Sequence, residues 1–414
     1  MKYNTFTLPN GLRIIHRPFP SEVAYCGYCI ATGSRHELAT ESGMAHYCEH
    51  LSFKGTGERS ARQIINCLEN RGGDLNAYTT KEHTTYYAAL LKQDILTAID
   101  LLSDMVFRSI YPQREAEKEL EVIIDEYNSY RETPSEVIYD EFERCLFEGN
   151  PLGRNIFGDF GQLRSCDSGS ILHFARSHYR PENMVFYVDG DVDFDRVVRR
   201  LEQRAVAEPL DSSYCRPAAP VTPNALAQPF RHVTHDESVT HQTHCLIGNR
   251  AYSMNDSRRI ALYLLNNILG GPGMSSRLNL LLREKYGLVY SVESAMVNYS
   301  DTGLWYTYFA CGDKDVKRCK RLLTKELEKL MENTLSPARL SIAKRQLKGQ
   351  IAVACDNREN FAIDYAKTYL YHAKEKDLGV LFEEIDSLSS AQLQAVAAEV
   401  FNPDSLCEYY LCAK

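Results

Sequence analysis

The feature that most constrains the fold is an order of helices and strands that the sequence pattern predicts twice. In the first half the pattern predicts a hairpin and strand over residues 3–30, a helix that follows Gly43, a helix over 61–70, and strands over 75–79 and 83–89. Helices near 92–107, 112–130 and 134–147 come next, then a loop over 148–165, a strand over 183–188 and a helix over 193–204. The second half repeats this order, with helices over 256–269 and 276–285, strands over 289–297 and 303–311, and further helices. We therefore expect two homologous α+β domains, each an antiparallel sheet with helices packed on one face.

The chain length agrees with this division. At 414 residues the chain is too long for one ordinary domain, and two domains of about 200 residues fit the usual range. Residues 207–228 contain four prolines among small residues, a composition typical of a semi-extended linker. The expected domains are therefore residues 1–207 and 229–414, joined by a linker over 208–228.

The stretch 43–56 contains the motif His46-x-x-Glu49-His50. Positions four apart lie on one face of a helix, so the two imidazoles are presented side by side. Two neutral imidazoles with a distant carboxylate suit tetrahedral zinc with an open position for water. Glu49 lies at the edge of the same face and can take a proton from that water, as in inverzincins. The motif predicts metal-assisted hydrolysis.

The motif alone does not decide the chemistry. With 12 histidines in the chain it can arise by chance, and without a metal it would be a polar stripe on a solvated helix. A third ligand is needed, and candidates lie on the helix predicted over 112–130. Glu119 and Glu126 are seven residues apart and share a face, although most glutamates on such a helix are solvated surface. Helical spacing leaves the choice open.

The chain resembles the insulinase/pitrilysin family of zinc peptidases, and most of all its short branch of the mitochondrial-processing-peptidase type. In that family the third ligand is a glutamate 76 residues after the second histidine, and Glu126 stands at that distance from His50. The resemblance implies that His46, His50 and Glu126 hold zinc. It implies that Glu49 is the general base and that Glu119 orients a ligand.

The resemblance extends over nearly the whole chain. The segments 8–12, 76–79, 272–278 and 283–291 resemble the family's opening hairpin, its substrate-binding strand and its second-half signature. It implies that Asn76 and Ala77 pair with the substrate main chain, and that Arg283 and Tyr290 donate hydrogen bonds to the substrate. Both side chains are donors that can meet developing negative charge. Since both parts occur on one chain, we expect a self-sufficient protomer or a homodimer.

Two other patterns point to no second site. His232, His235, His241 and His244 fall within thirteen residues, but they lie on expected strands, where positions three apart face opposite sides. Residues 270–273 read Gly-Gly-Pro-Gly without the Lys-Ser/Thr that follows in a phosphate-binding loop. We expect neither a second metal site nor nucleotide binding.

Composition excludes several classes of protein. The net charge of −8 argues against nucleic-acid binding, and no stretch approaches the ~20 apolar residues that span a bilayer. The N-terminus has no apolar core of the length that a signal peptide needs. Thirteen cysteines without a disulfide framework suit a reducing compartment. These observations predict a cytoplasmic protein.

Together these features predict a zinc endopeptidase with one zinc per chain. Its expected partners are unfolded peptides, enclosed between the two domains or in a dimer chamber, with a homodimer as the expected assembly and no membrane or nucleic acid. One alternative is a catalytically silent peptide-binding or scaffold subunit of the same fold. Another is a metal-independent peptide binder that uses only the half with Arg283 and Tyr290. Zinc content of the purified protein separates these alternatives from the peptidase.

Overall fold

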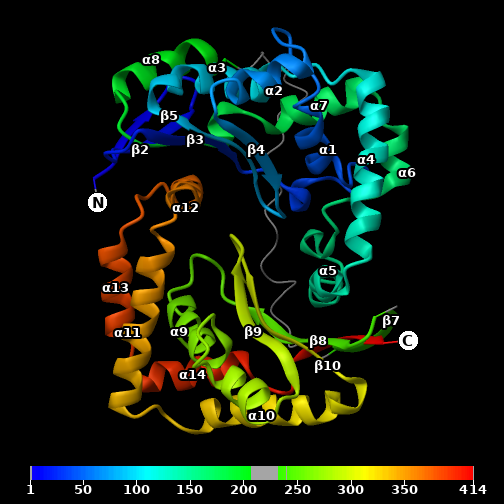
Figure 1. Ribbon diagram of the computed structural model, residues 1–414, viewed down its shortest axis with the longest axis vertical. Helices are drawn as coiled ribbons and strands as arrows, with labels where there is room; N and C mark the ends of the chain where they lie inside the picture. The colour runs from blue at the N-terminus through cyan, green and yellow to red at the C-terminus, as the bar shows by residue number, and fades with distance from the viewer. Residues whose placement is uncertain (1, 207–231, 239, 414) are drawn as a thin grey trace. The chain divides into compact units, whose positions relative to one another are not determined.

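The computed structural model describes residues 2–206, 232–238 and 240–413, so the expected linker lies outside the described residues. The described chain forms two compact units, each built on one sheet (Figure 1). The first unit comprises residues 2–128, 154–206 and 354–377. The second comprises residues 129–153, 378–413 and the described part of 232–353.

The first unit has six strands. All of its helices except one come from the first half of the chain. Its strands are β1 (Asn4–Thr7), β2 (Arg13–Arg17), β3 (Val23–Ile30), β4 (Asp74–Thr79), β5 (Thr84–Leu91) and β6 (Met184–Asp189). Its helices are α1 (Met44–Leu51), α2 (Ala61–Glu69), α3 (Ile95–Arg108), most of α4 (Gln113–Arg131), α6 (Phe160–Ser165), α7 (Ser168–His178), α8 (Phe194–Arg204) and α12 (Arg358–His372).

The second unit has five strands. They are β7 (His232–Ser238), β8 (Thr243–Ala251), β9 (Val289–Asn298), β10 (Gly303–Cys311) and β11 (Cys407–Ala413). Its helices are α5 (Pro134–Leu146), α9 (Arg259–Gly270), a π-helical segment over Asn279–Lys285, α10 (Val316–Glu332), most of α11 (Pro337–Ala354), α13 (Leu378–Ser387) and α14 (Ser390–Val400).

The two sheets have the same topology. The strand orders are β1-β2-β6-β3-β5-β4 and β7-β11-β8-β10-β9, so five strands of the first sheet have counterparts in the second. The pairs β2/β6 and β7/β11 are parallel, and the other pairs are antiparallel. The predicted fold class, two homologous α+β domains, is confirmed, with one parallel strand pair in each sheet.

Each sheet also packs against a helix from the other half of the chain. Helix α12 contacts β3 and β6, and α5 contacts β8 and β11. The side chain of Tyr28 meets Ser103 of α3, whereas Tyr187 meets Tyr365 of α12. Since Tyr187 pairs with Gly27, the neighbour of Tyr28, α3 and α12 cover opposite faces of the first sheet.

A buried carboxylate anchors α12 to the first sheet. Asp189, at the end of β6, is fully buried and accepts hydrogen bonds from Arg17 and from Nη2 of Arg358 at 2.7 Å. The guanidinium of Arg358 also lies over the ring of Phe19, 4.3 Å from its centre. Removing one partner of a buried ion pair costs about 3–5 kcal/mol, because the other charge stays buried. These contacts therefore hold α12, which comes from the second half of the chain, firmly on the first sheet.

Helix α1 is fixed by its apolar face and by its N-terminus. Tyr47, Cys48 and Leu51 are almost fully buried, and burial of a large apolar side chain such as that of Leu51 is worth about 1.5–3 kcal/mol. Gly43 precedes the helix with φ of 93°, and a Cβ there would lie 2.6 Å from a backbone oxygen, so only glycine fits. The carboxyl group of Glu37 accepts hydrogen bonds from the backbone N–H groups of Gly43, just before α1, and of Ala45 in its first turn.

One expected loop is partly helical. Residues 160–165 of the loop predicted over 148–165 form α6. The side chain of Asp159 accepts hydrogen bonds from the backbone N–H groups of Gly161 and Gln162, which starts the helix despite its glycine.

Among the described helices, none is both long and apolar enough to cross a membrane.

Candidate active site

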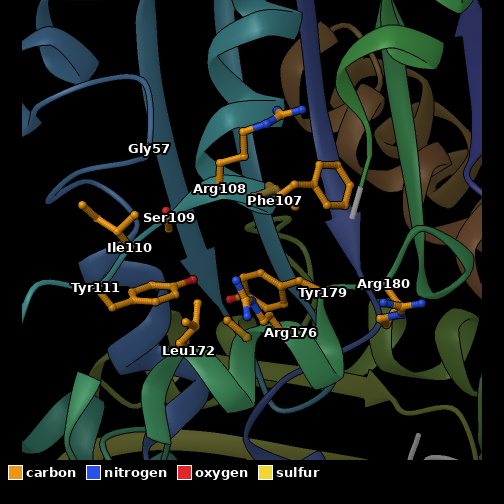
Figure 2. A pocket seen from close by; sticks show the side chains of 12 residues that line it. Gly57, Phe107, Arg108, Ser109, Ile110, Tyr111, Leu172, Arg176, Tyr179 and Arg180 are labelled. Atoms are coloured by element: carbon orange, nitrogen blue, oxygen red, sulfur yellow. The ribbon is translucent and has the colours of Figure 1, made fainter. Parts of the chain in front are cut away.

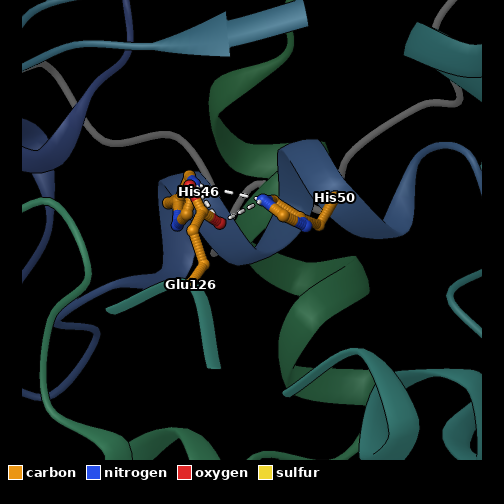
Figure 3. A group of neighbouring side chains, drawn as sticks. All are labelled: His46, His50 and Glu126. Carbon is orange, nitrogen blue, oxygen red and sulfur yellow. Dashed lines mark hydrogen bonds and ion pairs between the residues drawn. The ribbon is translucent and has the colours of Figure 1, made fainter. Parts of the chain in front are cut away.

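Three side chains from two helices converge on one point (Figure 3). Helix α1 supplies His46 and His50, one turn apart, and α4 supplies Glu126. The two Nε2 atoms are 3.1 Å apart, and Oε2 of Glu126 lies 3.4 Å from Nε2 of His50 and 4.0 Å from Nε2 of His46. All three ligand atoms lie within 4.8 Å of one another. The structure thus brings together the residues expected to hold the metal.

This donor set fits zinc. Zinc–nitrogen distances of 2.0–2.1 Å and tetrahedral angles place ligand atoms about 3.3 Å apart, within the span of the observed distances. Burial, with a contribution from neighbouring His50, lowers the pKa of His46 to about 3, so its imidazole is neutral, as a metal ligand must be. In the described chain no other group of His, Cys, Asp and Glu converges in this way.

Glu119 contacts His50 at Nδ1, the ring nitrogen that does not face the other two ligand atoms. Its Oε1 lies 3.1 Å from Nδ1 of His50, and its Oε2 accepts a hydrogen bond from Lys54 at 2.6 Å. An Nδ1–H donated to Glu119 leaves the lone pair of Nε2 directed at the metal position. Burial raises the pKa of Glu119, but the hydrogen bonds from His50 and Lys54 outweigh it and hold that pKa below the usual range.

The acidic neighbours favour a cation at this point. Burial lowers the pKa of His50, but Glu119, Glu49 and Glu126 together raise it by more than burial lowers it, so the net shift of this pKa is upward. A proton and a metal ion compete for the same electrostatic stabilisation. The site therefore attracts positive charge although two of its three ligands are neutral.

Glu49 is held by a residue that the sequence reasoning missed. It is buried, and Oγ1 of Thr79 donates a hydrogen bond of 2.5 Å to its Oε2. Burial raises the pKa of Glu49, although the Thr79 hydroxyl opposes the shift. Strand alternation places Thr79 on the same face of β4 as Ala77, one of the expected substrate-binding residues. This alternation is the sequence signal that could have identified Thr79 as a residue of the site.

The expected substrate strand lies at a sheet edge. β4 is the last strand of its sheet and pairs only with β5 among the described strands. Asn76 is exposed and Ala77 is half-buried, with side chains on opposite faces. An edge strand offers unpaired backbone N–H and C=O groups, which is what strand addition needs.

Arg283 and Tyr290 belong to the second unit. Arg283 lies in the π-helical segment, and its guanidinium is 5.7 Å from the ring centre of Tyr290 and 3.6 Å from Glu284. Tyr290 is the second residue of β9 and is 82% exposed, so its side chain is open to a ligand. Their contact with a substrate stays a prediction.

The histidines of the second unit have other surroundings. His235 stacks on Tyr410, and Nδ1 of His244 lies 2.8 Å from the hydroxyl of Tyr308. Helix α9, the counterpart of α1 in the repeated order, carries no histidine. Only the first unit presents a metal-binding group in the described chain.

A helix with His-x-x-Glu-His and a distant glutamate, set in a repeated α+β fold, defines the class of zinc metallopeptidases. Residues 14–159 match the family described as Insulinase (Peptidase family M16), and residues 165–347 match the Peptidase M16 inactive domain. The chain therefore belongs to the insulinase family of zinc metallopeptidases, family M16. The second match agrees with a half that lacks metal ligands.

Relatives with similar length support this assignment. The chain is 33% identical to an uncharacterized zinc protease of Streptomyces coelicolor over 398 residues, 95% of this chain and 86% of the relative. It is 30% identical to an uncharacterized zinc protease of Bacillus subtilis over 403 residues, 96% of both chains. These relatives support a peptidase role and the use of zinc.

Solved structures show the same fold. A protease from Helicobacter pylori superposes with a TM-score of 0.90 at 21% identity, covering 99% of both chains. A peptidase M16 inactive domain from Pseudomonas fluorescens gives a TM-score of 0.88 at 18% identity, covering 100% of this chain and 98% of that one.

Proposed function

We propose that this protein is a zinc endopeptidase that hydrolyses unfolded peptides and holds one zinc per chain. The observation that carries the proposal is the convergence of His46, His50 and Glu126, with Glu49 on the same helix. Two neutral nitrogen donors and one carboxylate leave a coordination position open, as catalytic zinc sites require.

Each side chain has a separate task in this proposal. Zinc, when bound, would supply a Lewis acid for the scissile carbonyl and lower the pKa of a water molecule. Glu49 would accept the proton of that water and return it to the leaving amine. The hydroxyl of Thr79 holds Oε2 of Glu49, which leaves Oε1 as the proton acceptor. Glu119 would keep His50 in the tautomer that binds metal.

The substrate would add as a strand to the edge of β4. Main-chain pairing at Asn76 and Ala77 would give affinity without strong sequence demands, and only an extended peptide can pair in this way. Arg283 and Tyr290 would donate hydrogen bonds to the substrate from the second unit. We further propose that the peptide is enclosed between the two units or in a homodimer chamber, and that folded proteins are excluded by size.

We also propose a cytoplasmic location. The support is the thiol chemistry of the chain, because eight of the described cysteines are buried as free thiols, a state that a reducing compartment preserves.

Two variants test the proposed chemistry. Glu49→Gln should retain one zinc per chain by elemental analysis and lose peptide cleavage by about 10²-fold or more, since an amide cannot take a proton. His46→Ala should lose the metal. Wild-type protein that cleaves a peptide library equally well after metal removal would refute the zinc mechanism. Zinc-loaded wild type that cleaves no peptide would favour the alternative, a silent peptide-binding subunit of the same fold.

A further inference from the structure

A pocket lies in the first unit, apart from the metal-binding residues. It is formed by residues 106–111, at and beyond the end of α3, by Gly57 and by residues 172–180 of α7 and the turn after it (Figure 2). Its volume is about 270 Å³. This is close to the lower end of the range for small-molecule sites, about 300–1,000 Å³.

The apolar wall of the pocket reaches the surface. Phe107 and Leu172 are partly buried, and Ile110 is 49% exposed, a high value for a large apolar side chain. The hydrophobic effect favours covering such a surface with an apolar group. The wall therefore suits a short aliphatic or aromatic body.

The charge of the lining has one sign. Of the twelve lining residues three are arginines, Arg108, Arg176 and Arg180, and none is acidic. Figure 2 shows Arg176 beside Tyr179, with Arg108 and Arg180 farther out. Guanidinium groups bind carboxylates through paired hydrogen bonds. Glu58 lies 3.9 Å from Arg108 and Glu182 lies 3.4 Å from Arg180, which offsets part of this positive charge. The lining itself still favours an anion over a cationic ligand.

A buried hydroxyl also faces the pocket. Tyr111 is 1% exposed, and its hydroxyl makes no hydrogen bond of acceptable geometry, although Ser52 and Ser109 lie nearby. Figure 2 shows this hydroxyl turned toward Tyr179. Tyr111 also has φ of 47°, a region that non-glycine residues rarely adopt. An unpaired buried donor in an uncommon conformation calls for an acceptor, which a carboxylate would supply.

We propose that this pocket binds a small apolar carboxylate. The carboxylate would lie between the guanidinium of Arg176 and the hydroxyl of Tyr111, and the apolar body would cover Ile110 and Leu172. Both a free short-chain acid and the C-terminal residue of a hydrophobic peptide have this chemistry, and the experiment separates them.

The pocket is connected to the metal helix by hydrogen bonds. The hydroxyl of Tyr179 lies 3.1 Å from that of Tyr86, which lies 3.0 Å from Oγ of Ser52. Oγ of Ser52 donates to the carbonyl oxygen of Cys48, in the helix that carries His46, at 2.8 Å. A ligand that contacts Tyr179 therefore acts on a chain of bonds that ends in α1, and its binding should slow hydrogen exchange of the α1 amides.

The competing explanation is structural. Arg176 lies in the last turn of α7, where a positive charge stabilises a helix end without any ligand. Under that explanation its replacement would reduce stability and would not change the affinity for an added acid. The two explanations therefore predict different results for the same variant.

The test is isothermal titration of the zinc-loaded full chain with octanoate and with N-acetyl-leucine, using octanamide as the neutral control. Replacing Arg176 by Gln should weaken binding of the acids about tenfold or more, because a hydrogen bond to a charged group is lost. Arg199→Gln, an exposed arginine on α8, is the control of equal charge change. Tyr111→Phe should weaken binding without reducing folding stability.

Binding that requires the carboxylate, fails in Arg176→Gln and persists in Arg199→Gln would establish the site. The acid that binds more tightly then identifies the source, a free acid or a peptide terminus. Absence of saturable binding, equal binding of octanamide, or equal affinity in wild type and Arg176→Gln would overturn the proposal. Unchanged exchange of α1 amides in the saturated protein would overturn the connection to the metal helix. None of these measurements depends on peptidase activity.

Discussion

Replacing Thr79 by Val removes the hydrogen bond that holds Glu49 and changes little else. The two side chains have nearly the same shape, and valine is favoured in strands, so β4 should keep its place. The Thr79 hydroxyl donates to Oε2 of Glu49 at 2.5 Å and lies 3.2 Å from Oγ1 of Thr84. Without it the carboxylate of Glu49 is buried with one oxygen unpaired and is free to turn away from the metal position.

The expected loss follows from the strength of that bond. A hydrogen bond to a charged group contributes about 1.5–3 kcal/mol. If this orientation is needed in the transition state, kcat/KM falls roughly 10-fold to 150-fold. Zinc content should not change, because Thr79 makes none of the contacts that join His46, His50 and Glu126.

The assay is cleavage of a quenched fluorescent peptide by zinc-loaded wild type, Thr79→Val and Thr79→Ser. Serine keeps the hydroxyl and should retain most of the activity. Unchanged kcat/KM in Thr79→Val would refute the role of the hydrogen bond in catalysis. Equal impairment of the serine and valine variants would show that packing of the methyl group matters and the hydroxyl does not.

Three further results are expected. Glu119→Gln should weaken zinc binding about 10–100-fold in a chelator competition, with Glu117→Gln on the same helix as the unaffected control; equal affinities would remove Glu119 from the metal site. Arg283→Ala and Tyr290→Phe should each lower kcat/KM about tenfold or more with zinc retained, and normal kinetics in both would exclude the second unit from catalysis. Burial raises the pKa of Glu37 from 4.5 to about 8, so its contribution to stability is complete below pH 4.5 and is lost as the pH rises through 8. The urea midpoint should therefore fall between pH 5 and pH 8 less in Glu37→Gln than in wild type, and equal falls would contradict the shift.

Elements with strong local signals were predictable from the sequence. The strand expected over 303–311 is β10 with the same bounds, and the helix expected over 112–130 is α4, Gln113–Arg131. The helix α6 was missed because a glycine lies in its first turn, and Asp159 compensates by capping that turn. Local propensity is informative where side chains agree with it, and a single cap can reverse it.

The metal-binding residues show the limit of local rules. His46 and His50 are neighbours because a helix returns to the same face after four residues, which any reader of the sequence can infer. Glu126 stands 76 residues beyond His50, and helical spacing left it equivalent to Glu119. Family resemblance distinguished them, and the geometry shows Glu126 at the two Nε2 atoms and Glu119 at Nδ1 of His50.

The sequence by itself determined the repeated order of elements, the helix that presents two imidazoles and the strand beside it, because each depends on residues within a few positions of one another. Only the tertiary structure decided that α12 packs on the first sheet, that Thr79 holds Glu49, and that Tyr179, Tyr86 and Ser52 connect the arginine-lined pocket to α1. These contacts join residues far apart along the chain. Which of these contacts form depends on which apolar surfaces are buried against each other and on which buried polar groups find hydrogen-bond partners. The spacing of residues in a single sequence does not contain this information.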